Sequence, residues 1–253
     1  MSESLLGFSW PLPRAVRAAF TTRLGGGSVA PWDSFNLGAH VGDSAQAVTA
    51  NRARLADLLE LPAQPAWLNQ VHGVAVADLD LAPPAPGPLT ADAVVTSGQR
   101  PCVIMVADCL PVLFAARDGR RIGAAHAGWR GLAGGVLENT VAALAVPGSA
   151  LTAWLGPAIL QPNFEVGAEV RQAFVRDDSA AEGCFEANAR GRWQADLVGL
   201  ARRRLERLGI TDIHGGDWCT FADRQRFFSH RRDGHLADGK GGRMAALIWK
   251  HGS

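Results

Sequence analysis

Tyrosine is absent from the 253-residue sequence, so no tyrosine hydroxyl can act as an acid or a nucleophile. Lysine occurs only at Lys240 and Lys250, and the other basic residues are arginines, whose planar fork suits phosphate and carboxylate groups. The formal net charge is only +1. A chain so close to neutral has no overall electrostatic attraction to nucleic acid or to an anionic membrane, so neither is expected as the main partner.

Long hydrophobic runs are also absent. No stretch approaches the roughly 20 apolar residues that a membrane-spanning helix needs, and the longest apolar run, at 101–116, contains Asp108 and Pro111. The first residues lack the basic start and apolar core that are typical of a signal peptide. The sequence therefore predicts a cytoplasmic protein without a membrane segment.

Cysteine is scarce and widely spaced. The four cysteines form no CxxC pair, and a disulfide framework is not expected in a cytosolic protein of this size. Each cysteine is therefore predicted to be either a small core residue or a chemically active one. They are Cys102, Cys109, Cys184 and Cys219.

Hydrophobic periodicity predicts a mixture of strands and helices. A helix is expected over 43–61, capped by Ser44 and ended by Pro62. Strands are expected on both sides of a turn at His72–Gly73, and the β-rich run at 101–117 is interrupted at 107–109. Further strands are predicted at 14–20, 91–97, 122–126, 151–159, 210–216 and 244–250, and further helices at 132–145, 166–175 and 196–209.

Many of these strands come in pairs with links of hairpin length. That pattern favours α+β layers over a doubly wound parallel sheet. The Pro-rich segment 82–88 is predicted to be a surface connection, but strands continue on both sides of it. The whole chain, 1–253, is therefore predicted to be a single domain.

Polar residues interrupt the apolar pattern in three places where a strand ends beside Gly or Pro. Gln70 and His72 are two residues apart, so on a strand they share one face. Asp108 lies inside an apolar run next to Cys109, and a buried carboxylate needs a partner or a functional site. The simpler interpretations are a turn with a surface histidine and an inert core cysteine.

The third place follows a strand built from small residues. His126 lies near the end of this strand, and Gly and Ala around it let other groups approach closely. Arg130 comes just before a predicted helix, where anions are often bound. The simpler interpretation is a strand-to-helix turn with the arginine in solvent.

Two histidines and one cysteine, His72, Cys109 and His126, are a plausible zinc set. A catalytic zinc takes three protein ligands and keeps a fourth position open. The spacing of these residues matches no short zinc motif. The same cysteine and a histidine could instead form a thiolate–imidazole pair for acyl chemistry, as in a hydrolase or amidase with a Cys109 nucleophile and a His126 base.

A series of motifs from about Thr21 to Trp249 resembles the YfiH-type family, whose members are called laccase-like polyphenol oxidases, peptidoglycan editing factors or purine nucleoside phosphorylases. The resemblance extends over nearly the whole chain. The motifs, in order, are TTRLGGGS, SFNLGAHVGD, NRARL, WLNQVHG, ADAVVT, ADCLPVLF, GAAHAGWRGL, WLGPAI, EVGAEV, CT and FFSHRRDG followed by GRMAALIW.

The resemblance implies a four-layer αββα fold with mixed β-sheets. It also implies one zinc ion on His72, Cys109 and His126, and phosphorolysis of adenosine, inosine and methylthioadenosine with adenosine deamination as a second activity. Nucleosides and phosphate would then be the partners. Family members often carry Tyr where this chain has Phe228 and His230, and the linker HLADGKGG is unusual. These departures leave the metal set intact but put a substrate role of the 228–243 loop in doubt.

Further roles follow as hypotheses from this chemistry. Asp108 is expected to orient a ligating histidine or to move a proton. Gln70 and Asn36 are candidates for reading the polar edges of base or ribose, although turn bonding is the simpler role for Asn36. The candidate phosphate-binding residues are Arg23, Arg130 and Arg231.

Two other functions compete with this one. The first is multicopper oxidase chemistry, since copper could bind the same ligands. It is disfavoured because one His2Cys site cannot supply several copper centres, and the chain has only seven histidines. A non-catalytic role in cell-wall quality control is the other alternative. A purified protein that binds metal and nucleoside but catalyses no reaction would favour that role.

Overall fold

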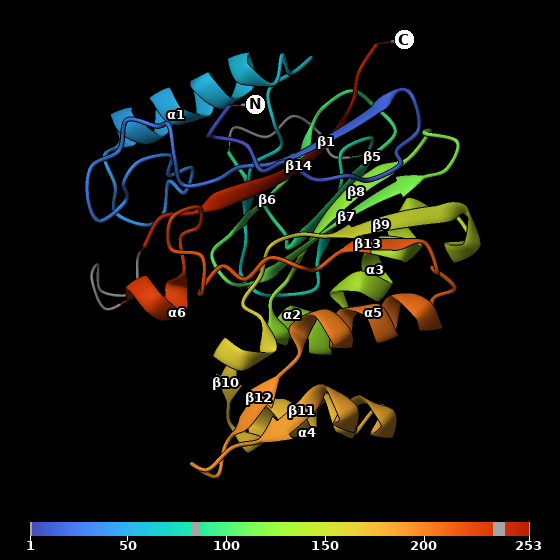
Figure 1. Cartoon of the computed structure of the whole chain (residues 1–253). Helices are drawn as coiled ribbons and strands as arrows, with labels where there is room; N and C mark the ends of the chain where they lie inside the picture. Colours follow the sequence, from blue (N-terminus) through green and yellow to red (C-terminus); the bar gives the residue numbers. More distant parts are fainter. Residues whose placement is uncertain (1, 82–86, 235–240, 253) are drawn as a thin grey trace.

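Two stacked β-sheets form the centre of the computed structural model, which describes residues 2–81, 87–234 and 241–252. The smaller sheet is antiparallel, with the order β1–β14–β6. The cyan helix α1 lies along its outer face in Figure 1. The elements of this half are β1 (Val16–Phe20), β14 (Met244–Lys250), β6 (Cys102–Val106) and α1 (Ala45–Leu58).

The larger sheet has the strand order β13–β9–β7–β8–β5–β3. Its four central strands are antiparallel, whereas the outer strands β13 and β3 run parallel to their neighbours. The strands are β13 (Ile213–Gly215), β9 (Leu151–Leu155), β7 (Leu110–Ala116), β8 (Ile122–Ala127), β5 (Ala93–Thr96) and β3 (Val76–Asp78). Its outer face is covered by α3 (Val136–Leu144) and α5 (Leu197–Arg207), as Figure 1 shows.

Alternating side chains of β7 connect the layers. Leu113 points between the two sheets, where it packs in a buried cluster with Ile104 and Trp154. Phe114 points the other way, into the cluster that includes residues of α3 and α5. A third cluster joins Leu55 of α1 to the outer face of the smaller sheet. These three cores separate four layers, so the predicted α+β, αββα fold is confirmed, and the larger of its two stacked sheets is the mixed one.

Smaller elements complete the chain. Two short strands, β2 (Leu68–Asn69) and β4 (Leu89–Thr90), pair in parallel. A further three-stranded sheet, absent from the sequence prediction, lies beside α4 at the bottom of Figure 1. The remaining elements are β10 (Glu165–Val166), β11 (Phe185–Ala187), β12 (Trp193–Ala195), α2 (Trp129–Gly134), α4 (Ala168–Val175), α6 (His230–Asp233) and 3-10 turns at Gly148–Ala150, Gln161–Asn163 and Ser179–Cys184.

Helix boundaries differ from the predicted ones for local reasons. Ser44 does cap α1, because its side chain accepts a hydrogen bond from the Ala47 N–H. The helix ends at Leu58, before Pro62, and Glu60 takes a left-handed φ of 47°. The single helix predicted over 132–145 begins earlier and is divided into α2 and α3 at Gly135, whose φ is +99°.

Two of the interruptions noted in the sequence are crossings between sheets. The chain passes from β6 in the smaller sheet to β7 in the larger one through residues 107–109. Similarly, β2 and β3 flank His72 but do not pair with each other, because β2 pairs with β4 and β3 with β5. The expectation of hairpin links is therefore wrong here, although β7 and β8 do form a hairpin.

No helix among the described residues is long and apolar enough to cross a membrane. Most of the Pro-rich connection predicted at 82–88, namely 82–86, lies outside the described residues, as does 235–240 of the 228–243 loop.

Candidate metal centre and its cavity

Three side chains that lie far apart in the sequence meet at one end of the larger sheet. The ligand atoms of His72, Cys109 and His126 all lie within 4.8 Å of one another. The Cys109 Sγ is 3.8 Å from the His72 Nε2. Tertiary folding thus brings together the three residues that the sequence singled out as metal ligands.

Each of the three comes from a different kind of local structure. His72 occupies the turn between β2 and β3 with a left-handed φ of 60°. Cys109 directly precedes β7 at the crossing between the sheets, after Asp108, whose φ is also positive at 86°. His126 lies on β8 opposite Pro111 of β7. Because β7 and β8 are neighbours, Cys109 and His126 are held together by the strand register.

Asp92, which the sequence analysis did not single out, holds two of the three ligands in place. Its Oδ1 lies 2.8 Å from the His126 Nδ1 and accepts the His72 backbone N–H at 2.9 Å. Its Oδ2 accepts the backbone N–H groups of Val71 and Gly73 at 3.1 and 2.7 Å. The residue is fully buried just before β5. The signal was present in ADAVVT, where a carboxylate precedes an apolar strand.

The hydrogen bonds of Asp108 go to other residues than the predicted histidine. Its Oδ1 accepts the Thr220 hydroxyl at 2.6 Å, and its Oδ2 accepts the Ser229 hydroxyl at 3.0 Å and the Arg231 backbone N–H at 2.7 Å. It therefore fastens the crossing between the sheets to the C-terminal segment that contains α6. The contact with a candidate ligand histidine belongs to Asp92, so the expectation that Asp108 orients such a histidine is corrected.

The donor set fits a borderline-soft metal such as zinc. Two imidazoles and a thiolate are common zinc ligands, and a carboxylate on the far nitrogen of a ligating histidine is a frequent supporting contact. Gly128 keeps the space around the ligands open, because a Cβ there would lie 3.0 Å from the Cys109 Sγ and 3.1 Å from the His72 Cδ2. His72 is exposed and His126 is buried, so a bound ion would remain accessible from one side.

Cys109 and His126 shift each other's pKa in opposite directions. Burial opposes ionisation of Cys109, but the charges and hydrogen bonds of His126 and His72 outweigh it and lower the thiol pKa to about 6. Burial likewise opposes protonation of His126, but the Cys109 thiolate and Asp92 raise its pKa to about 9. Burial would raise the pKa of the Asp92 carboxyl, yet bonds from His126 and Gly73 hold it below its usual value. Cys109 is thus poised as a thiolate, the form that binds metals and acts as a nucleophile.

The three ligands line a cavity of about 120 Å³. It also contains a guanidinium group and two further imidazoles, none of which the sequence analysis assigned to the site. The lining residues are His40, Gln70, His72, Met105, Val106, Ala107, Cys109, His126, His230 and Arg243.

Gln70 and Asn36, the two residues predicted to contact the base or ribose, both form hydrogen bonds with the backbone through their side-chain amides. Gln70 lines the cavity, but its Nε2 donates to the Met105 carbonyl at 2.9 Å and its Oε1 accepts the Met105 N–H at 2.8 Å. Asn36 is fully buried and does not line the cavity. Its Oδ1 accepts the backbone N–H groups of Gly38 and Arg243. Turn bonding, the simpler interpretation for Asn36, describes its contacts.

The three arginines predicted to bind phosphate are not among the residues that line this cavity. Arg23 pairs with Asp33 in a separate surface pocket. Arg130 is exposed at the start of α2 and stacks over the Trp129 ring. Arg231 is exposed and donates to the Glu165 carbonyl at 3.0 Å.

Comparison with known proteins places this architecture in a family. The model of the multi-copper polyphenol oxidoreductase laccase family matches residues 17–251. The chain belongs to this family, the YfiH-type family. It is 52% identical over 242 residues to a purine nucleoside phosphorylase of Pseudomonas aeruginosa, covering 95% of this chain and 96% of that protein. It is 48% identical over 240 residues to the purine nucleoside phosphorylase YfiH of Escherichia coli, with the same two coverages.

Solved structures of the family share the fold. A crystal structure of a Neisseria meningitidis protein superposes with a TM-score of 0.91 at 46% identity, covering 98% of this chain and all of that one. The structure of YlmD from Geobacillus stearothermophilus superposes with a TM-score of 0.88 at 29% identity, covering 98% and 97%. Within the described residues, the one group of three close side chains that could hold a metal ion is His72, Cys109 and His126.

Proposed function

We propose that this family member is a zinc-dependent purine nucleoside phosphorylase that acts on adenosine, inosine and methylthioadenosine, and that it also deaminates adenosine. The observation that carries the proposal is the His72–Cys109–His126 cluster, which opens into a cavity with a cationic wall. Relatives that match nearly the whole chain are named purine nucleoside phosphorylases, which supports the same reaction.

Phosphorolysis exchanges one bond at the sugar for another. A phosphate oxygen forms a bond to the anomeric carbon of the ribose while the bond from that carbon to the purine nitrogen breaks. The electron pair of the broken bond leaves with the purine, which then takes up a proton. In the second activity, water replaces the exocyclic amine of adenosine and ammonia leaves. Both reactions need polar side chains and an electrophilic group that can contact the purine nucleoside.

The residues around the cavity suit these needs. A zinc ion held by His72, Cys109 and His126 would supply Lewis-acid chemistry. Asp92 fixes the His126 ring through Nδ1, so the other ring nitrogen remains for the metal. Gln70 fixes the wall formed by Met105 while keeping a second amide N–H. We assign Asp108 a positioning role, because its carboxylate is occupied by three hydrogen bonds from the C-terminal segment.

A Cys109→Ala variant tests the proposal. We expect loss of bound zinc and of phosphate-dependent cleavage of inosine, because two histidines alone rarely hold a catalytic zinc. The measurements are metal analysis of the purified protein and release of hypoxanthine with and without phosphate. Cys219→Ala is the matched control, since Cys219 is partly exposed and outside the cavity. Full activity of Cys109→Ala without bound metal would overturn the zinc proposal.

A second candidate is a hydrolase or amidase with Cys109 as the nucleophile. It is favoured by the arrangement of three side chains: the Cys109 thiol, whose pKa is lowered, lies beside His126, and His126 in turn contacts Asp92. A thiol reagent separates the two functions. Under the zinc proposal, bound metal protects Cys109 until a chelator is added. Immediate modification of zinc-loaded protein, with loss of esterase or amidase activity, would support the nucleophile instead.

A further inference from the structure

Arg243 is a cation on the cavity wall without a carboxylate partner in the described part of the chain. It directly precedes β14 and lines the cavity together with the three metal-binding side chains. Its NH1 group donates to the carbonyls of Gly241 and Gly242. Its Nε and NH2 groups have no hydrogen bond to a described residue. Part of this guanidinium therefore remains available for a ligand.

Other partly buried arginines of the described chain are occupied. Arg121 pairs with Asp78 and Asp80, and Arg204 pairs with Glu138. Arg52 lacks a carboxylate, but it donates from Nε and NH2 to the Leu37 carbonyl and stacks on the Trp67 ring. Arg243 therefore differs from them in lining the candidate site while keeping free donors.

The loop around Asn36 and Gly38 positions both the backbone and the side-chain stem of Arg243. The Arg243 backbone N–H donates to the buried Asn36 Oδ1 at 2.9 Å, and the same oxygen accepts the Gly38 N–H. A Cβ on Gly38 would lie 2.8 Å from the Arg243 Cγ, so only glycine leaves room for the arginine stem. The loop that carries Asn36 and Gly38 also brings His40 to the cavity. This loop thus builds one wall as a unit.

The charges at this wall favour an anion. Burial lowers the pKa of the Arg243 guanidinium, but arginine stays protonated at neutral pH. The negative groups that act on it are Cys109 and Asp108. Cys109 belongs to the metal set, and both oxygens of Asp108 already accept hydrogen bonds. Neither is bonded to Arg243, so no negative group among the described residues neutralises the cation directly.

We propose that Arg243 binds the attacking phosphate in this cavity, which the imidazoles of His40 and His230 also line. A guanidinium matches a phosphate through two parallel hydrogen bonds, and it would hold the anion next to the metal set. This inference rests on the proposed phosphorolysis for its biological meaning, but the anion site itself can be measured without turnover. It replaces Arg23, Arg130 and Arg231 as the phosphate-binding residue.

The test compares Arg243→Gln, Arg243→Lys and the unchanged protein, each loaded with zinc. Inorganic phosphate is titrated into each protein and followed by phosphorus NMR, and the KM values for phosphate and inosine are measured separately. For Arg243→Gln we expect phosphate affinity to fall and the phosphate KM to rise by about tenfold to a hundredfold, because a charge-assisted hydrogen bond is lost. The inosine KM should change by less than about threefold, and Arg243→Lys should recover part of the effect.

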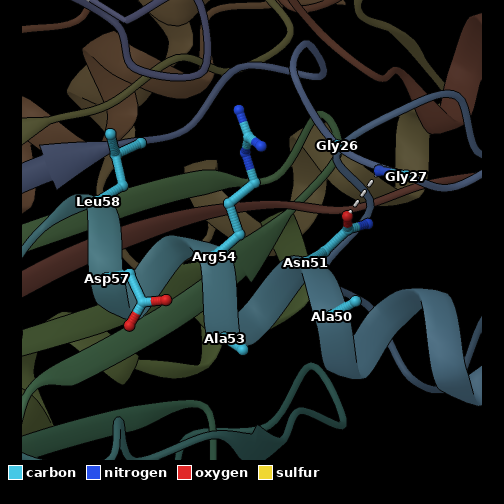
Figure 2. Close-up of a pocket in the computed structure, with 8 residues that line it drawn as sticks. All are labelled: Gly26, Gly27, Ala50, Asn51, Ala53, Arg54, Asp57 and Leu58. Atoms are coloured by element: carbon cyan, nitrogen blue, oxygen red, sulfur yellow. Dashed lines mark hydrogen bonds between the residues drawn. The ribbon is translucent and has the colours of Figure 1, made fainter.

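Arg54→Gln is the matched control. Figure 2 shows Arg54 on α1 beside a different surface hollow, which Gly26, Gly27 and Asn51 also line. The Arg54→Gln substitution should leave the KM values for phosphate and inosine unchanged. Unchanged phosphate affinity in Arg243→Gln would overturn the inference even if inosine phosphorolysis is confirmed. Conversely, Arg243-dependent phosphate binding in a protein that turns over no nucleoside would support the anion site and contradict the proposed function.

Discussion

At the residue scale, Asp92 organises more of the candidate centre than any ligand does. One buried carboxylate contacts the ring of His126 and three consecutive backbone N–H groups, at Val71, His72 and Gly73. Its two oxygens therefore set the orientation of one ligand and the turn that carries another. A carboxylate in such a position keeps the ring in the tautomer that a metal needs.

Asp92→Asn tests this role. An amide accepts on one side only, so it cannot serve His126 and the turn equally, and we expect zinc affinity to fall by about tenfold to a hundredfold. Competition with a chromogenic chelator measures the affinity. Asp118→Asn is the control, because Asp118 is exposed and pairs with Arg120. Wild-type zinc affinity in a folded Asp92→Asn protein would show that the contact does not support the metal.

At the scale of elements, the site lies where strands give way to turns and helices. His72 and Asp108 both adopt left-handed φ values, so each lies at a sharp change of chain direction. Gly128 is the residue before α2 and directly follows β8, close against the Cys109 Sγ. The short connection between β8 and α2 therefore closes one side of the ligand cluster, and its lack of a side chain is part of the geometry.

Gly128→Ala should disturb the cluster without removing a ligand. The added Cβ would meet the Cys109 Sγ at 3.0 Å and the His72 Cδ2 at 3.1 Å, so one ligand must shift. We expect zinc affinity to fall by roughly tenfold, because metal affinity depends on the orientation of the ligands. The same chelator competition measures it. Gly183→Ala is the matched control, since a Cβ there meets nothing within 4 Å. Equal affinities in the two variants would contradict this geometry.

At the scale of the whole molecule, the two sheets hold the site through a shared core. Leu113 and Trp154 of the larger sheet pack against Ile104 of the smaller sheet, and all three are almost completely buried. Because β6 and β7 belong to different sheets yet are joined through 107–109, the position of Cys109 depends on how the sheets pack. Stability and site geometry are therefore coupled.

Leu113→Ala should lower the free energy of unfolding by about 2–5 kcal/mol, the range for truncating a buried leucine. Urea unfolding followed by tryptophan fluorescence measures the change. Leu81→Ala, at a position that is 81% exposed, is the control and should change stability by less than about 0.5 kcal/mol. A small effect at Leu113 would mean that the space between the sheets collapses readily.

The sequence by itself determined most of the strands and helices of the two main sheets and their covering layers, the α+β class and the three candidate ligands. Apolar alternation and strand breaks are local features, and the family motifs preserved the order of His72, Cys109 and His126. Only the tertiary structure decided which other residues contact these ligands and line the cavity beside them. Asp92 and Arg243 look ordinary in the sequence, because their roles depend on groups 20 residues or more away, such as His126 and Asn36. Arg23, Arg130 and Arg231 looked equally suitable, because a sequence shows that an arginine is present but not which cavity its side chain reaches.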